Sequence, residues 1–156
     1  MRILQIIILA AVMIASPVLA EEKRIHAAEG DKCPVCGMFV AKYPDFLAQV
    51  VFTDGSTAFF DGTKDMFKYL LDLQRYVPSK KAADIDKIHV TDYYSMNAID
   101  GRTAWYVVDS DVYGPMGKEL IPFGSEAEAK EFMADHAGKG MLRFTEINSE
   151  LIQTLD

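Results

Sequence analysis

Asp54-Gly55 separates two short apolar segments, residues 47–52 and 57–60. Both segments are rich in β-branched and aromatic residues, as strands are, and glycine tolerates the positive φ angle that a tight hairpin turn requires. The pattern therefore predicts two adjacent antiparallel strands. A helix is expected directly after them, because Asp61 or Thr63 can cap it and apolar residues then recur at helical spacing up to Val77-Pro78.

The second half of the chain repeats this order. Residues 103–108 and 119–123 have the composition of strands, Ser125 with Glu128 forms a capping box that begins a second helix, and residues 141–147 resemble a closing strand. A strand over residues 88–94 follows the first helix in the same way. The sequence therefore predicts an α+β fold of two related β-β-α-β units with antiparallel sheets.

The N-terminus has the pattern of an export signal. A basic start at Arg2 precedes an apolar stretch, and Val18-Leu19-Ala20 fits the small-residue rule for cleavage. The stretch is shorter than the ~20 residues that a membrane-spanning helix needs. No cysteine follows Ala20, so we expect a mature protein that is free in the periplasm and has no lipid anchor.

The expected organisation has four parts. They are a cleavable signal peptide (1–20), a flexible lead-in (21–30), a binding domain (31–148, with sub-units 31–87 and 88–148) and a C-terminal tail (149–156). The formal net charge of −7 repels phosphate backbones, which argues against a nucleic-acid partner. Motifs of serine hydrolases, zinc proteases and phosphate-binding loops are absent from the sequence, so we do not expect an enzyme.

Cys33-Pro34-Val35-Cys36-Gly37-Met38 places two thiols and a thioether within one short segment. If the backbone from Cys36 onward is extended, the period of two puts Cys36 and Met38 on the same face. Thiolates and thioethers are soft ligands, which select Cu(I) over hard cations such as Mg²⁺ or Ca²⁺. The motif therefore predicts a cuprous site.

Other interpretations of this motif remain open. A structural zinc site needs four ligands, but there is no second Cys-x-x-Cys motif and the three histidines are scattered along the sequence. A thiol-disulfide oxidoreductase would place Cys33 and Cys36 at the start of a helix, whereas Phe39-Val40 favour a strand. The oxidoreductase is the main alternative, and an interaction module that binds no metal is the third.

Met116 is a candidate for a further ligand. It lies in the turn Tyr113-Gly114-Pro115-Met116-Gly117, where a methionine has no helical face to pack against. A side chain that folds back onto the core explains its position equally well.

Several segments together resemble one known family, and they occur in the order that the family has. They are Cys33-Pro34-Val35-Cys36-Gly37-Met38, Phe59-Phe60-Asp61, Ala104-Trp105-Tyr106-Val107, Asp111-Val112-Tyr113-Gly114-Pro115-Met116-Gly117 and Leu120-Ile121-Pro122-Phe123. Over residues 31–147 the chain resembles the NosL family, the accessory proteins of nitrous oxide reductase. The resemblance implies a Cu(I) chaperone of the bacterial envelope that supplies copper for the copper-sulfide centre of the reductase. The implied partners are the reductase and a membrane transporter complex.

The resemblance also implies a set of ligands. The family's Cys-x-Met pair falls on Cys36 and Met38, and Met116 matches its later methionine turn. Cys33 is not required by the family pattern. We therefore take Cys36, Met38, Cys33 and Met116 as the candidate metal ligands. Many members of the family are lipoproteins, whereas this sequence lacks the lipid-accepting cysteine at its predicted cleavage site.

Overall fold

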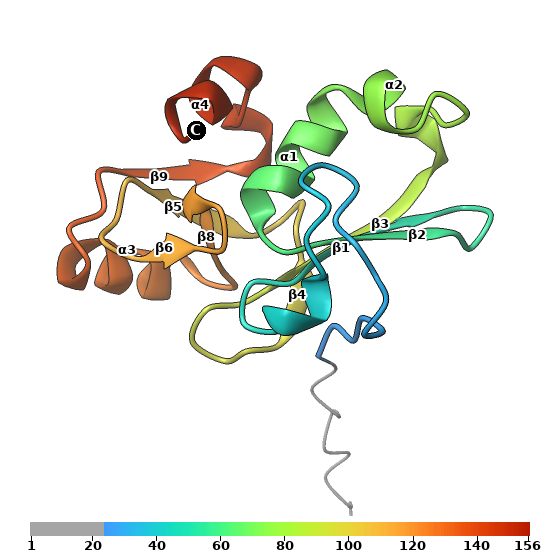
Figure 1. The fold of residues 1–156 in the computed structure, drawn as a ribbon. Coiled ribbons are helices and arrows are strands. Elements are labelled where there is room, and N and C mark those ends of the chain that lie inside the picture. Colours follow the sequence, from blue (N-terminus) through green and yellow to red (C-terminus); the bar gives the residue numbers. More distant parts are fainter. Residues whose placement is uncertain (1–23) are drawn as a thin grey trace, which may run out of the picture.

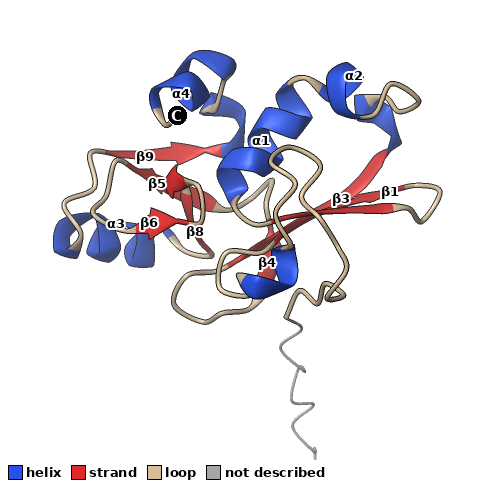
Figure 2. Ribbon diagram, viewed as in Figure 1, coloured by secondary structure: helices blue, strands red, loops and turns tan. Residues whose placement is uncertain are grey.

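The computed structural model describes residues 24–156, which form two main antiparallel sheets with helices packed against them and a small two-stranded hairpin. Figure 2 shows the mixture of helices and strands, which confirms the predicted α+β class. The predicted signal peptide lies outside the described residues. Within residues 24–156, no helix combines the length and the apolar character that crossing a membrane requires.

The first unit is a four-stranded sheet with the order β2-β1-β3-β4, in which every neighbouring pair is antiparallel. In chain order its elements are β1 (Ala48–Phe52), β2 (Thr57–Phe60), α1 (Thr63–Leu71), α2 (Leu73–Tyr76), β3 (Ile85–Thr91) and β4 (Ala98–Asp100). The predicted hairpin joins β1 and β2, and Gly55 at its turn has a φ angle of 84°. The expected border between residues 87 and 88 lies inside β3.

The second unit is a three-stranded antiparallel sheet with the order β8-β5-β9. Its elements are β5 (Trp105–Val108), β8 (Ile121–Phe123), α3 (Glu126–Asp135) and β9 (Gly140–Arg143). A small hairpin of β6 (Tyr113–Gly114) and β7 (Gly117–Lys118) is inserted between β5 and β8. In both units the first strand lies between the second strand and the strand after the helix, so the two units share one topology.

Strand β5 is buried on both faces, and it joins the two units into one core. On one face, the ring of Tyr106 packs edge-on against Phe67 of α1, with 5.2 Å between the ring centroids. On the other face, Val107 belongs to a separate apolar cluster with Phe123 and Phe132 beneath α3. Alternate residues of β5 therefore contact the helices of different units.

Residues 149–156, expected only as a C-terminal tail, contain helix α4 (Ser149–Thr154). The side chain of Asn148 caps this helix by accepting a hydrogen bond from the backbone N–H of Leu151 at 3.0 Å. Ile152 and Leu155 are buried, and α4 packs beside α1 (Figure 1). The last residues of the chain are therefore part of the fold.

Candidate metal centre

The cysteines lie on a tight loop that precedes the first sheet. Its two ends are held by a hydrogen bond from the backbone N–H of Val40 to the carbonyl of Asp31, at 3.1 Å. Inside it, the N–H of Cys33 donates to the carbonyl of Met38 and the N–H of Gly37 donates back to the carbonyl of Cys33, each at 2.9 Å. These bonds place residues 34–36 in a turn.

Gly37 decides how the sulfurs of this loop are arranged. Its φ angle is +79°, in the left-handed region that glycine adopts without a steric penalty. Residues 36–40 are therefore not one extended strand, because a 3-10 helix also begins at Val40. The alternation that would put Cys36 and Met38 on one strand face does not apply here.

Two carboxylates from the start of α1 meet the loop. Asp61 directly follows β2, and Asp65 lies four residues later in the first turn of α1. Asp61 precedes the N-cap residue Gly62, so it lies just outside the helix, and negative charge is favourable where backbone N–H groups point out of a helix N-terminus. Both carboxylates are nevertheless almost fully buried, with exposed fractions of 1% for Asp61 and 3% for Asp65.

Each thiol donates a hydrogen bond to one of these carboxylates. The Sγ of Cys33 lies 3.3 Å from Oδ2 of Asp65, and the Sγ of Cys36 lies 3.2 Å from Oδ1 of Asp61. One ligand atom from each of the four side chains lies within 4.8 Å of the others. Two metal–sulfur bonds of about 2.3 Å span a similar distance, so a single ion fits between these atoms.

The second oxygen of Asp61 is available to a cation. Oδ2 of Asp61 is buried and has no hydrogen-bond partner among residues 24–156. Buried polar atoms in folded proteins are nearly always paired, and an unpaired carboxylate oxygen is costly to bury. Cys33 is buried and Cys36 is half-buried, so an ion would reach this group from the side of Cys36.

The protonation of the thiols separates metal binding from redox chemistry. Burial raises the pKa of the Cys33 thiol far above its ordinary value, and burial also raises the pKa of Cys36 to about 12. Both cysteines are free thiols. A redox-active thiol needs a lowered pKa, commonly at a helix N-terminus. Thiols of this kind become thiolates only if a metal ion replaces their protons.

The structure places the four predicted ligands differently. Cys33 and Cys36 are brought together. Met38 is half-buried, and its carbonyl closes the loop. Met116 is 44% exposed at the tip of the β6–β7 hairpin, and its carbonyl accepts a hydrogen bond from Nζ of Lys64, the residue before Asp65, at 2.8 Å. The assignment of Cys36, Met38, Cys33 and Met116 as ligands stays a prediction.

Asp61 and Asp65 were missed as possible ligands. A signal existed, because both carboxylates stand at the expected start of a helix, where negative charge is favourable. The sequence did not indicate their partners, since the hydrogen bonds to the cysteines join residues 25 and 32 positions apart. With these carboxylates the group offers two soft and two harder donors. The sulfurs suit Cu(I), and the complete set also suits Zn²⁺.

Comparisons with known proteins agree on one family. The NosL family model matches residues 24–152. The copper-binding lipoprotein NosL of Stutzerimonas stutzeri is 32% identical in an alignment of 132 residues that covers 80% of this chain and 66% of the relative. This chain therefore spans just under two thirds of that relative.

A solved structure has the same fold. The crystal structure of the copper chaperone NosL from Shewanella denitrificans superposes with a TM-score of 0.67 at 25% sequence identity. The match covers 83% of this chain and 98% of the solved one. The topology described above is therefore shared with a protein that is named a copper chaperone.

One expectation needs correction. We expected a protein that is free in the periplasm and has no lipid anchor, but the relative from Stutzerimonas stutzeri is named a lipoprotein, which points to a lipid-anchored envelope protein. The expectation depended on a missing cysteine at one predicted cleavage site, and that site lies outside the described residues. On the family match over residues 24–152 and the sequence identity to its named relative, this chain belongs to the NosL family.

Proposed function

We propose that this chain binds a cuprous ion as cargo and delivers it to a copper enzyme. The observation that carries the proposal is the meeting of the Cys33 and Cys36 sulfurs in a buried group of four donor atoms within 4.8 Å of one another. Sulfur donors select Cu(I) because both partners are soft. The names of the relatives, a copper-binding lipoprotein and a copper chaperone, support the same cargo.

In this proposal Cys36 supplies a thiolate and Met38 a thioether, and Cys33 or Met116 completes the coordination. Asp61 and Asp65 place negative charge beside the cation, which offsets the cost of holding it away from water. Cys36 is half-buried, whereas Cys33 is buried. The ion therefore leaves past Cys36, and a site of two or three sulfurs releases it more readily than a closed cage of four ligands.

The recipient that we propose is nitrous oxide reductase, whose copper-sulfide centre requires copper, with a membrane transporter complex as a further partner. What supports this recipient is the resemblance of the sequence to the NosL family, the accessory proteins of that reductase. To test it, the Cu(I)-loaded protein is mixed with the copper-free reductase, and copper in each protein is measured after separation. We expect copper in the reductase and none transferred from the Cys36→Ser variant. If the copper stays with this protein, the reductase is not its recipient.

The central test is direct Cu(I) binding in competition with a chromogenic chelator. Cys36→Ser should abolish stoichiometric binding, because serine offers no soft ligand. Met133→Leu is the matched control, since Met133 packs in the separate cluster beneath α3. An unchanged affinity in Cys36→Ser would refute the proposal.

Zinc is the competing cargo, because the group also contains two carboxylates. Zn²⁺ would use both Asp61 and Asp65, so Asp61→Asn should weaken zinc binding while it leaves most of the Cu(I) affinity in place. If zinc binds more tightly than Cu(I) and needs both carboxylates, the site is a zinc site. The raised pKa values of the two thiols disfavour the oxidoreductase function. If the protein were an oxidoreductase, its dithiol form would rapidly reduce insulin disulfides.

A further inference from the structure

A pocket lies on the face of the first sheet that is turned away from α1. On β3, Ile88 and Val90 are buried in the core with α1, so the alternation of the strand turns Lys87 and His89 to the opposite face. A pocket of about 450 Å³ opens there, and Gln49 of β1 also lines it. Pockets that hold small ligands have volumes of this order.

The first described residues of the chain complete this pocket. Ile25 is buried, whereas its neighbours Arg24 and His26 are exposed. All three line the pocket together with Lys87 and His89 of β3. Two basic side chains and two imidazoles, from segments that are distant in sequence, therefore surround one hollow.

The cationic side chains of this pocket have no partner of opposite charge. Within residues 24–156, the side chains of Arg24, His26 and Lys87 form no hydrogen bond, ion pair or ring contact. None of the residues that line the pocket in this part of the chain is acidic. Acidic residues nevertheless outnumber Lys and Arg by 23 to 16 in the whole sequence, so a lining without any carboxylate sets this pocket apart.

Several basic side chains elsewhere in the chain do have partners. Nζ of Lys64, a lysine that is only 2% exposed, donates to two backbone carbonyls. Nζ of the exposed Lys118 pairs with the carboxylate of Asp109 at 2.9 Å. A group of unpaired positive charges in a concave site attracts anions, because the low-dielectric walls concentrate its field.

The two imidazoles of the pocket do not favour a metal ion, because the charges of Arg24 and Lys87 repel a cation. Nδ1 of His89 also lies 3.1 Å from Oε1 of Gln49, so one ring nitrogen is already occupied. Asp100 faces His89 from β4, but it does not line the pocket. Among residues 24–156, the one group of three or more metal-binding side chains is that of the cysteines.

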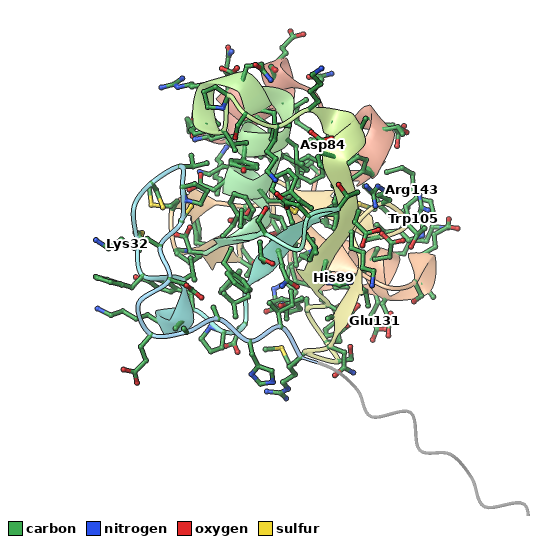
Figure 3. All side chains as sticks on the ribbon, turned by 90° about the vertical axis from the view of Figure 1, so that its right-hand side faces the viewer. Lys32, Asp84, His89, Trp105, Glu131 and Arg143 are labelled. Atoms are coloured by element: carbon green, nitrogen blue, oxygen red, sulfur yellow. The ribbon has the colours of Figure 1, made fainter. Side chains whose placement is uncertain are left out.

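We propose that this pocket binds the phosphate group of an anionic ligand, with Arg24 and Lys87 as its charged contacts. A phosphate group suits donors that arrive from several segments, because it presents three or more acceptor oxygens where a carboxylate presents two. The phosphate is free in solution or belongs to a phospholipid headgroup. The site is separate from the cysteines, since Figure 3 shows His89 on the sheet and Lys32 on the cysteine loop well apart.

The three histidines of the chain allow a direct test, because only two of them line the pocket. Inorganic phosphate is titrated into the protein at constant pH and ionic strength, and the imidazole proton resonances are followed by NMR. Those of His26 and His89 should shift and saturate. Those of His136, which pairs with Asp111 at 2.9 Å at the end of α3, should not move. Equal shifts of all three would show an unspecific ionic effect and overturn the inference.

Substitutions then identify the charged contacts. Arg24→Gln and Lys87→Gln should each weaken phosphate binding about fivefold, since each removes one charge-assisted hydrogen bond at an open site. Lys139→Gln is the matched control, because it removes the same charge at an exposed position outside the pocket. If Lys139→Gln weakens binding as much as Lys87→Gln does, the net charge of the protein attracts the anion and the inference is wrong.

Vesicles distinguish a phospholipid from a free phosphate compound. If the ligand is a headgroup, the protein should sediment with phosphatidylglycerol vesicles and not with phosphatidylcholine vesicles, and the double variant Arg24→Gln, Lys87→Gln should lose this binding. If the ligand is free, the histidine resonances should shift with phosphate and the protein should not sediment. Sedimentation of the double variant to the same extent, or neither response in the unmodified protein, would overturn the inference.

Discussion

The two β-β-α-β units share a topology, but they begin their helices in different ways. In the second unit, the hydroxyl of Ser125 accepts the backbone N–H of Glu128 at 3.2 Å and donates to its carboxylate at 2.7 Å. Phe123, two residues earlier, is fully buried among aromatic rings. The side-chain cap of α3 therefore comes from its own sequence, although the N–H of Gly124 just before it donates to Oδ2 of Asp92 from the first unit at 2.6 Å.

The first helix of the first unit has no such cap from its own sequence. Gly62 stands before α1 and offers no side-chain cap, so Glu119 from the second unit takes that role. Asp61, the counterpart of Phe123 when the two junctions are aligned, is a buried carboxylate. The comparison teaches that the candidate metal centre lies in the unit that leaves a buried carboxylate oxygen, Oδ2 of Asp61, without a hydrogen-bond partner among residues 24–156, and such an oxygen is what a cation can use.

Of the substitutions that compare the two units, Phe132→Ala should lower the free energy of unfolding most, and it should leave Cu(I) binding unchanged. Phe132 is fully buried in the second unit and contacts Phe123, with 4.9 Å between the ring centroids. Removing a buried phenyl group costs about 3–5 kcal/mol, to be measured by urea unfolding. The Cu(I) affinity of the folded protein should stay unchanged. A matching loss of affinity would mean that the second unit shapes the site directly.

The free energy of unfolding, measured as a function of pH, should reveal the contribution of Glu119, which caps α1 from the second unit. Burial raises the pKa of Glu119 from 4.5 to about 7, so the folded state holds this proton more tightly than the unfolded state does. The associated stability is fully present below about pH 4.5 and is lost as the pH rises to about 7. The expected loss is on the order of 3 kcal/mol.

Glu119→Gln is the control for this titration. Glutamine keeps an oxygen that can accept the N–H of Lys64, but it has no proton to lose in this range. Subtracting its unfolding free energies from those of the unmodified protein should therefore isolate a decline between pH 4.5 and 7. Parallel curves for the two proteins would mean that Glu119 titrates normally.

Ser125→Ala should have the smallest effect of the three. It removes the cap of α3, which costs about 1 kcal/mol, and Cu(I) binding should not change. Ser79→Ala, at an exposed position in a loop, is the control and should leave the urea midpoint where it is. A loss in Ser125→Ala no larger than in this control would show that the second unit does not depend on its own cap.

Much of the fold was predictable because its signals are local. The Asp54-Gly55 turn and the Ser125–Glu128 capping box each act within a few residues, and the structure has both. Helix α4 had a local signal too, in the cap that Asn148 provides, but it was overlooked. The expected strand after Cys36 is interrupted by the left-handed conformation of Gly37. A glycine in a sequence does not indicate whether its φ angle will be positive or negative.

The candidate site was predictable only in part. The two cysteines are only three positions apart in the sequence, so their meeting required no knowledge of the fold. Asp61, Asp65 and Lys64 acquire their importance from partners that are distant in sequence and are brought near only by packing. No periodicity distinguishes a lysine that will be buried from one that will be exposed. Figure 3 shows the more usual case in Lys32, whose side chain extends outward from the cysteine loop.

The burial of β5 on both faces has a thermodynamic consequence. The core beside α1 takes Tyr106 from the second unit and Ile152 and Leu155 from the far end of the chain. Cutting out the cysteine-bearing half would expose all of these contacts to water at once, and the fragment would lose the interior that orders α1. We therefore expect the two halves to unfold together in a single cooperative transition, and we expect the cysteine-bearing half not to fold when it is separated from the rest.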